Sequence, residues 1–271
     1  MRRCAGFTLI EMIMVIIITG IIATVLAGVI KRPIDGYLDL TRRAELVDAA
    51  DSALRLIARD IRRALPNSVR VDSTGPSLEM INTVDAVRYR LGPPGNQSKR
   101  LRFNPDDDEF NTIGEFTNLT PPVTSSTDYR LVIYNLGISG ASAYENANVI
   151  TPAATQVTIT DDGTSDHIAL SSAFQFAFES PRQRLYVVDA SPVSYICDTA
   201  NETLRRYASY SIGSTQPSGS SVVVTKHLTA CSISYDAGST GQAALVTLSL
   251  TLSDGGESVT MLHQVRVDNV P

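Results

Sequence analysis

The residues able to perform acid–base, metal or nucleophilic chemistry are scattered along this 271-residue chain. Its histidines, His167, His227 and His263, are far apart, and none lies in a His-Glu-x-x-His zinc motif. The chain has no Gly-x-Gly, no Gly-Lys and no Gly-x-Ser-x-Gly sequence, so phosphate-binding loops and the nucleophile elbow are missing. We therefore predict no catalytic residue and no cofactor, with an active site built from distant residues as the alternative.

Two acidic segments have the oxygen-rich composition that calcium prefers. Their aspartates are Asp106, Asp107, Asp108, Asp161 and Asp162. Neither segment has EF-hand spacing, and runs of like charge are usually solvated loops. We expect exposed loops, and we keep weak calcium binding as the alternative hypothesis.

Two cysteines lie in the C-terminal half of the chain. Cys197 and Cys231 are each at the edge of a strand-like stretch, whereas Cys4 precedes a long apolar run. A disulfide between Cys197 and Cys231 is the natural prediction, and it would require an oxidising compartment such as the periplasm. The alternative is two separate buried thiols, because cysteine is among the most buried residue types.

The net charge of −5 is unevenly distributed. Residues 31–70 contain nine basic and six acidic residues, whereas residues 71–271 contain twelve basic and twenty-one acidic residues. Binding of nucleic acid depends on clustered basic side chains that displace phosphate counterions. The acidic C-terminal part therefore argues against a nucleic-acid partner.

Residues 7–30 are almost wholly apolar and contain one charged residue, Glu11. A helix of this length would measure about 36 Å, which is enough to cross a hydrocarbon layer of about 30 Å. The run is longer than the apolar core of a signal peptide and lacks a clean cleavage site after it. A carboxylate at the centre of such a helix costs about 2.5 to 3.5 kcal/mol, so Glu11 should meet a cation, unless it lies near enough to the end to reach headgroups and water.

The sequence Gly6-Phe7-Thr8-Leu9-Ile10-Glu11, after a short basic leader, resembles the N-terminus of type IV prepilins and pseudopilins. The resemblance implies cleavage after Gly6 by a membrane-embedded prepilin peptidase and methylation of the new N-terminus at Phe7. It also implies that Glu11, as the fifth mature residue, neutralises the terminal amine of a neighbouring subunit during assembly. An ion pair of this kind is strong in low dielectric, and either partner alone in lipid is costly.

After the apolar run we expect a helical stalk. Pro33 and Gly36 should kink or loosen the helix, because proline deletes a hydrogen bond and clashes one turn back. One apolar helical face then follows, with members at spacings of three and four. These members are Val47, Ala50, Leu54, Ile57, Ile61 and Leu65. The arginines off that face, such as Arg59 and Arg62, are either a solvated surface or a dock for acidic neighbours, and the helix should end near residues 66–67.

The remainder of the chain predicts an antiparallel sheet. The candidate strands are residues 78–81, 84–91, 129–134, 157–160, 174–178, 185–188, 193–197, 204–210, 231–235, 244–252 and 259–267. Residues 246–252 alternate strictly between apolar and polar, which is typical of a half-buried antiparallel strand. Turn chemistry at residues 254–257 predicts a terminal hairpin. The predicted fold is therefore α+β, with one long helix, membrane-spanning in its first half and amphipathic in its second, packed on an antiparallel β-sheet body.

The predicted organisation is a leader at residues 1–6, a membrane and assembly helix at 7–30, a stalk helix at 31–66 and a β-rich periplasmic body at 67–271. The motifs at 59–62, 195–198, 204–207 and 267–271 make the body similar to minor pilins of the mannose-sensitive haemagglutinin pilus and to large minor pseudopilins of type II secretion.

The resemblance implies an inner-membrane precursor that enters a filament, at its tip or in its initiation complex. The implied partners are prepilin peptidase, other pilins or pseudopilins, the inner-membrane assembly platform and the membrane. A membrane-tethered periplasmic enzyme or binding module is the rival hypothesis.

Overall fold

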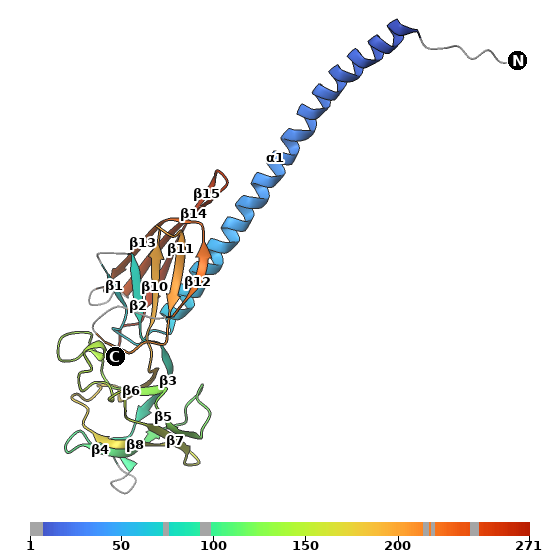
Figure 1. Ribbon diagram of the computed structural model, residues 1–271. Coiled ribbons are helices and arrows are strands. Elements are labelled where there is room, and N and C mark those ends of the chain that lie inside the picture. Colours follow the sequence, from blue (N-terminus) through green and yellow to red (C-terminus); the bar gives the residue numbers. More distant parts are fainter. Residues whose placement is uncertain (1–7, 73–75, 93–98, 214–216, 218–219, 239–243) are drawn as a thin grey trace, which may run out of the picture.

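The computed structural model describes residues 8–72, 76–92, 99–213, 217, 220–238 and 244–271, without the side chains of residues 27 and 30–32. Helix α1 (Leu9–Arg62) is continuous over 54 residues, about 80 Å. It ends where the amide of Arg63 donates to the carbonyl of Asp60 and the amide of Ala64 donates to the carbonyl of Ile61. Its N-terminal half stands clear of the strands (Figure 1). The predicted α+β architecture is confirmed.

The predicted kink at Pro33 is wrong, because α1 passes through Pro33 without interruption. Figure 1 shows a gentle curve along the helix in place of a break. One missing hydrogen bond costs about 3 kcal/mol, and the long helical stretches on both sides outweigh it because helix propagation is cooperative. The helix also ends a few residues before the predicted stop at residues 66–67.

Two antiparallel sheets flank the C-terminal half of α1 (Figure 1). The first, in spatial order, contains β1 (Arg70–Asp72), β2 (Ser77–Met80), β10 (Val193–Asp198), β11 (Thr203–Tyr207) and β12 (Ser221–Lys226). The second contains β13 (Leu228–Asp236), β14 (Ala244–Asp254) and β15 (Glu257–Val267). In the predicted terminal hairpin, Asp254 pairs with Glu257 across the turn, as expected.

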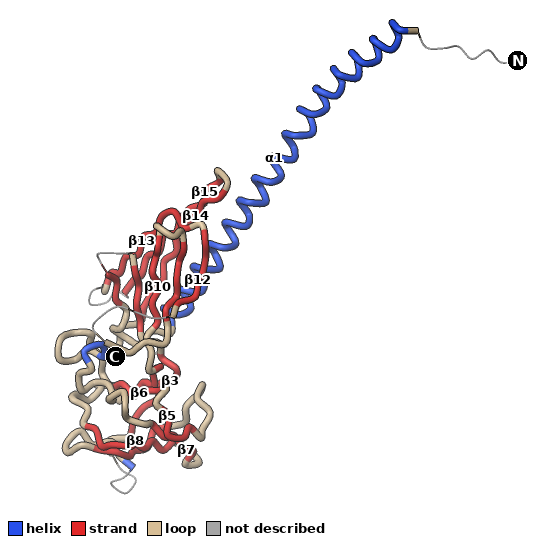
Figure 2. Tube along the Cα trace, in the orientation of Figure 1, coloured by secondary structure: helices blue, strands red, loops and turns tan. Residues whose placement is uncertain are grey.

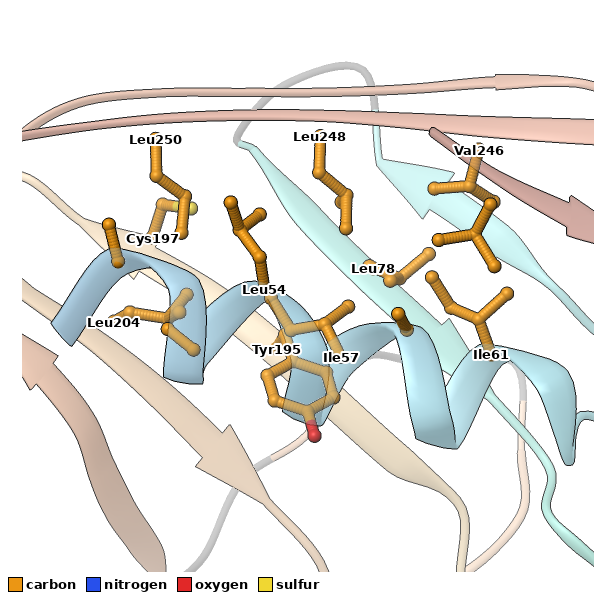
Figure 3. Close-up of a cluster of buried hydrophobic side chains, with 14 of the residues drawn as sticks. Leu54, Ile57, Ile61, Leu78, Tyr195, Cys197, Leu204, Val246, Leu248 and Leu250 are labelled. Carbon is orange, nitrogen blue, oxygen red and sulfur yellow. The ribbon is translucent and has the colours of Figure 1, made fainter. Parts of the chain in front are cut away.

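One apolar core joins α1 to both sheets, as Figure 3 shows. Leu54, Ile57 and Ile61 point from the helix towards the alternating inward side chains of β14, among them Leu248 and Leu250. The predicted helical face is buried except at its first member, Val47, which remains exposed. Val47 is therefore not part of this core.

A third sheet is inserted in the chain between β2 and β10. Its spatial order is β5 (Val123–Ser126), β7 (Val157–Asp161), β8 (Asp166–Phe174), β4 (Asp107–Ile113), β3 (Thr83–Tyr89), β9 (Arg184–Asp189) and β6 (Tyr129–Val132). A short 3-10 helix, η2 (Ala143–Glu145), lies between β6 and β7. We call residues 83–189 the inserted module; it has its own core and lies at the end of the molecule away from the N-terminus of α1 (Figure 2).

Several strands differ from the sequence-based prediction. The strand expected at 174–178 is displaced, because β8 (Asp166–Phe174) ends where it was expected to begin. β1, β4, β5 and β12 were not predicted. The acidic start of β4 resembles a loop, whereas the valine and threonine residues of β12 favour a strand, so its local signal was missed.

The inserted module is fastened to the stalk at the end of α1. The side-chain amide of Asn67 donates to the carbonyl of Asn135 at 2.9 Å, and that of Asn135 donates to the carbonyl of Pro66 at 2.7 Å. The C-terminal tail lies at the same junction, where Arg184 donates to the carbonyl of Val270 at 2.9 Å (Figure 1). Three parts of the chain are thus held together at one place.

Candidate functional site

The predicted site residues lie at the start of α1. Gly6 and Phe7 are outside the described residues. Glu11 lies in the first turn, where the amides of Glu11 and Met12 donate to the carbonyl of Thr8 at 3.1 and 3.2 Å. A carboxylate in the first turn interacts favourably with the helix dipole. The Glu11 side chain is exposed, so it is available to a cation supplied by another molecule.

The helical segment Leu9–Leu26 has a mean hydropathy of 2.7, and none of it is buried within the molecule. It measures about 27 Å, close to the thickness of a hydrocarbon layer. The hydroxyl groups of Thr19 and Thr24 donate to carbonyls one turn earlier, at 2.6 Å to Val15 and 2.8 Å to Ile21. The polar atoms of these threonines are thus satisfied inside the helix, as a membrane-spanning segment requires.

A buried polar contact holds the other end of α1 in the body. The carboxylate of Asp60, which is buried, accepts a hydrogen bond from the Tyr195 hydroxyl at 2.7 Å and one from Arg206 Nε at 3.1 Å. Burial, followed by the hydrogen bond to Asp60, raises the pKa of Tyr195 above its ordinary value. This cluster joins α1 to the adjacent strands β10 and β11.

A second buried cluster joins the first sheet to the inserted module. Glu79 on β2 is fully buried and pairs with Arg70 Nε. The Tyr210 hydroxyl donates to Glu79 at 2.8 Å, and Arg70 lies over the Tyr144 ring at 3.8 Å. Because Tyr144 belongs to η2, the Arg70 side chain bridges the stalk side and the module side of the molecule.

The tip of the terminal hairpin contacts α1 near its middle. Arg42 lies 3.7 Å from Asp254, and Arg43 lies 3.8 Å from Glu257. Exposed ion pairs of this kind contribute little stability, about 0 to 1 kcal/mol. They do mark the level at which α1 leaves the body and extends alone.

The structure joins Cys197 and Cys231 in a disulfide, with a Cα–Cα distance of 6.2 Å. Cys197 is on β10 and Cys231 is on β13, so the bond links the two sheets that share the helix core. It closes a long loop of chain beside the buried face of α1.

The acidic segments form two different environments. Asp107 is buried at the start of β4 and accepts two hydrogen bonds from Arg102, at 2.9 Å from the amide and 2.8 Å from the guanidinium. The prediction of a solvated loop is therefore wrong for Asp107, because Arg102 compensates its burial. Asp106 and Asp108 are exposed, as predicted.

In the second segment, Asp162 accepts hydrogen bonds from Lys99 at 2.8 Å and Asn111 at 2.7 Å, which lower the pKa of that carboxyl. Asp161 is exposed and accepts a hydrogen bond from the amide of Gly163. Within the described residues, no three histidine, cysteine, aspartate or glutamate side chains converge as metal ligands would.

The histidines do not form a nucleophile–base pair in the described part of the chain. His167 contacts Asn111 at 2.9 Å and Glu109 at 3.6 Å, and His227 lies 3.8 Å from Asp254. A histidine that activates a nucleophile needs a hydroxyl or thiol within hydrogen-bond reach. None of these three contacts has that form.

Sequence reasoning placed Asp60, Tyr195 and Arg206 in separate motifs and did not bring them together. The available signal was the position of Asp60 between Ile57 and Ile61 of the buried face, where a lone carboxylate requires partners.

Comparison with known proteins agrees with the geometry of the N-terminal segment. Residues 1–27 match the family model described as the prokaryotic N-terminal methylation motif. The match supports a type IV pilin-like chain of the pilin and pseudopilin class, processed by prepilin peptidase and assembled with other pilins. The apolar helix and the motif are consistent with a membrane-anchored pilin. No curated protein and no solved structure gives a significant match to the chain.

Proposed function

We propose that this chain is a minor type IV pilin, of the kind represented by minor pilin O of the mannose-sensitive haemagglutinin pilus, that enters a filament through its N-terminal helix. The observation that carries the proposal is the combination of the methylation motif at residues 1–27 with an apolar helix that no other described part of the chain covers. A helix exposed in this way needs either lipid or other helices around it. Lipid would surround it before assembly, and neighbouring pilin helices would surround it afterwards.

The way α1 is anchored supports this function. Its C-terminal half shares a core with two sheets, and Asp60 is held by two hydrogen bonds from neighbouring strands. A force applied to the free end of α1 would therefore reach the body through packed side chains. The disulfide between the sheets fits a periplasmic location of the body before assembly.

A position at the tip or in the initiation complex is the finer part of the proposal. The body contains a three-stranded sheet, a five-stranded sheet and the inserted module with its seven-stranded sheet. A body this bulky would pack poorly in the repeating shaft of a tight helical filament. Immunogold labelling at filament ends supports the tip position, and even labelling along the filaments contradicts it.

In this proposal the chain is not an enzyme. Cleavage and methylation are carried out by prepilin peptidase, and assembly is driven through the inner-membrane platform. The chain contributes the substrate Gly6-Phe7 bond, the membrane helix and the interaction surface of the body.

Mass spectrometry of the membrane-extracted chain tests the processing step. We expect a mature chain that starts at Phe7 with an N-methyl group. A chain that retains residues 1–6 would contradict the proposal and favour a membrane-tethered enzyme or binding module.

The variant Glu11→Ala tests the assembly step. Loss of the carboxylate leaves a partner's terminal amine unpaired in lipid, and we expect incorporation into filaments to fall about tenfold or more while cleavage after Gly6 continues. Glu45→Ala, an exposed acidic residue further along α1, is the matched control and should incorporate normally. Normal incorporation of Glu11→Ala would contradict the proposal.

A minor pseudopilin of type II secretion is the second candidate, since the N-terminal motif is common to both systems. Deletion of the gene separates them: loss of surface pili with normal enzyme secretion supports the pilus, and the reverse result supports the secretion system.

A further inference from the structure

A second apolar stripe runs along α1 beside the face that forms the core. Tyr37, Leu40, Ala44 and Val47 follow one another at spacings of three and four residues, the repeat of a helix–helix seam. Tyr37, Leu40 and Val47 are 69%, 70% and 39% exposed, so the described part of the chain leaves much of their surface open. We call these four residues the second stripe.

The second stripe opens into a groove of about 560 Å³ between α1 and β15. Leu40, Ala44, Val47 and Met261 contribute apolar side chains to the groove. Charged side chains border it, including Arg43 and Asp48. An apolar floor with charged borders is typical of a groove that accepts an amphipathic helix.

Lipid does not account for this exposure. Leu40 and Val47 lie about 21 Å and about 32 Å along the helix from Leu26, the end of the apolar window. The window itself is long enough to span most of the hydrocarbon layer. The second stripe therefore lies in water when Leu9–Leu26 crosses the membrane, and apolar side chains in water favour association.

The charges beside the second stripe select the partner. With Ala44 at position a of a heptad, Arg43 takes position g and Asp48 takes position e. In a parallel, in-register pair of helices, position g of one helix faces position e of the next heptad on its partner, so Arg43 of each helix faces Asp48 of the other. Two copies that cross the same membrane in the same sense are necessarily parallel.

Both residues are available for this contact. The Arg43 side chain is 62% exposed, and the ion pair that it forms with a described residue is a long one, to Glu257 at 3.8 Å. Asp48 is exposed, and no ion pair joins it to another described residue.

We propose that the second stripe is the seam of a parallel, in-register pair formed with a second copy of this chain in the membrane, with Arg43 of each copy paired to Asp48 of the other. The pair would bury the stripe before the chain enters a filament. The proposal rests on the membrane-spanning part of the proposed function and not on filament assembly.

Cysteine cross-linking of the full chain in isolated membranes tests the seam. The variant Ala44→Cys places a thiol at position a, on the axis of the pair, whereas Glu45→Cys places one at the same level outside the seam. We expect mild oxidation to give at least about fivefold more chain-to-chain adduct for Ala44→Cys than for Glu45→Cys, measured above the unsubstituted chain. Equal yields would overturn the proposal, as would an adduct that mass spectrometry shows to contain a different protein.

Charge reversal tests the register. In the Ala44→Cys background, Asp48→Arg places an arginine of each copy opposite Arg43 of the other. The like charges repel at both contacts, and we expect the yield of adduct to fall about threefold or more. Adding Arg43→Asp to the same chain restores opposite charges, and we expect the adduct to return. A double variant that remains as weak as Asp48→Arg alone would overturn the register.

Two apolar positions provide a matched control. Leu40→Asn removes a member of the second stripe, whereas Leu38→Asn changes a residue that is 48% exposed but lies off it. Only Leu40→Asn should weaken cross-linking, and an equal effect of both would overturn the seam.

Analysis of the N-terminus in the same membranes distinguishes this inference from the proposed function. A methylated Phe7 without the cross-link contradicts this inference alone. The cross-link on a chain that retains its leader contradicts the proposed function alone.

Discussion

At the residue scale, two carboxylates of α1 have opposite environments. Glu11 is exposed on an apolar helix, whereas Asp60 is buried and has both of its hydrogen-bond partners within the chain. The difference follows from position, because Asp60 lies where α1 meets two strands and Glu11 lies where α1 meets nothing in the described chain. We therefore expect substitution of Asp60 to lower the stability of the fold and substitution of Glu11 to impair assembly.

The first prediction concerns Asp60. Asp60→Ala leaves the Tyr195 hydroxyl and Arg206 without their acceptor, and we expect a loss of about 2 to 3 kcal/mol in the free energy of unfolding. Denaturant unfolding of the detergent-solubilised chain measures it. Glu45→Ala on the exposed face is the control and should change the free energy by less than about 0.5 kcal/mol. Equal effects of the two variants would show that the Asp60 cluster does not anchor the helix.

The second prediction concerns buried tyrosines. Burial raises the pKa of Tyr89 to about 12, and it also raises the pKa values of Tyr195 and Tyr210. Above pH 10 the unfolded chain loses these phenolic protons while the native chain keeps them, so the free energy of unfolding should fall as pH rises from 10 towards 12. Unfolding at several pH values measures the slope, and Tyr89→Phe should make it shallower. A stability independent of pH in this range would contradict the prediction.

At the element scale, α1 has two apolar faces, of which one is buried and the other is exposed. The face containing Leu54, Ile57 and Ile61 is buried against the sheets, and the second stripe, which includes Val47, is not. The spacing of three and four residues is the same for both faces. Only the presence or absence of strands beside each face distinguishes the core from a surface open to another molecule.

The third prediction concerns the link between the sheets. Replacing Cys197 and Cys231 together by serine removes a cross-link over 34 residues, and we expect a loss of about 3 to 4 kcal/mol in the free energy of unfolding on the chain-entropy model. Thermal unfolding with and without reductant measures it. Reductant should lower the melting temperature of the unsubstituted chain and leave that of the double variant unchanged. A melting temperature insensitive to reductant in both chains would contradict the prediction.

At the scale of the whole molecule, the inserted module interrupts one sheet without disrupting it. Met80 on β2 pairs directly with Val193 on β10, although the module lies between them in sequence. The amide of Asp189 donates to the carbonyl of Asn82 at 3.1 Å, so the chain leaves the stalk side and returns to it at nearly the same point. The two connections between the module and the stalk side therefore lie next to each other.

The fourth prediction follows from this arrangement. Removing residues 83–189 and joining Asn82 to Ala190 through a short glycine linker should leave a chain that folds, forms the disulfide and keeps its helix content. Its melting temperature should be lower, because the excision uncovers buried residues at the junction such as Leu65 and Ile81. Circular dichroism and thiol titration measure these properties. A shortened chain with free thiols and little strand content would show that the stalk needs the module to fold.

Local sequence determined the features that depend on neighbouring residues. The apolar run with Glu11, the alternation at residues 246–252 and the turn at 254–257 each contain their own structural signal within about ten residues. A helix in lipid must satisfy its hydrogen bonds internally, so composition alone specifies it. The α+β class and the terminal hairpin could be predicted for the same reason.

Tertiary structure decided the features that depend on distant partners. The extent of β8, the burial of Asp107 beside Arg102, the continuity of α1 through Pro33 and the meeting of Asp60 with Tyr195 have no complete local signal. Each results from a tertiary contact or from a cooperative run of helix. The free energy that this gains is larger than the conformational preference of the local sequence. The assignment of one helical face to the core and of its neighbour to solvent has the same origin, because periodicity records that a face is apolar and only packing specifies what covers it.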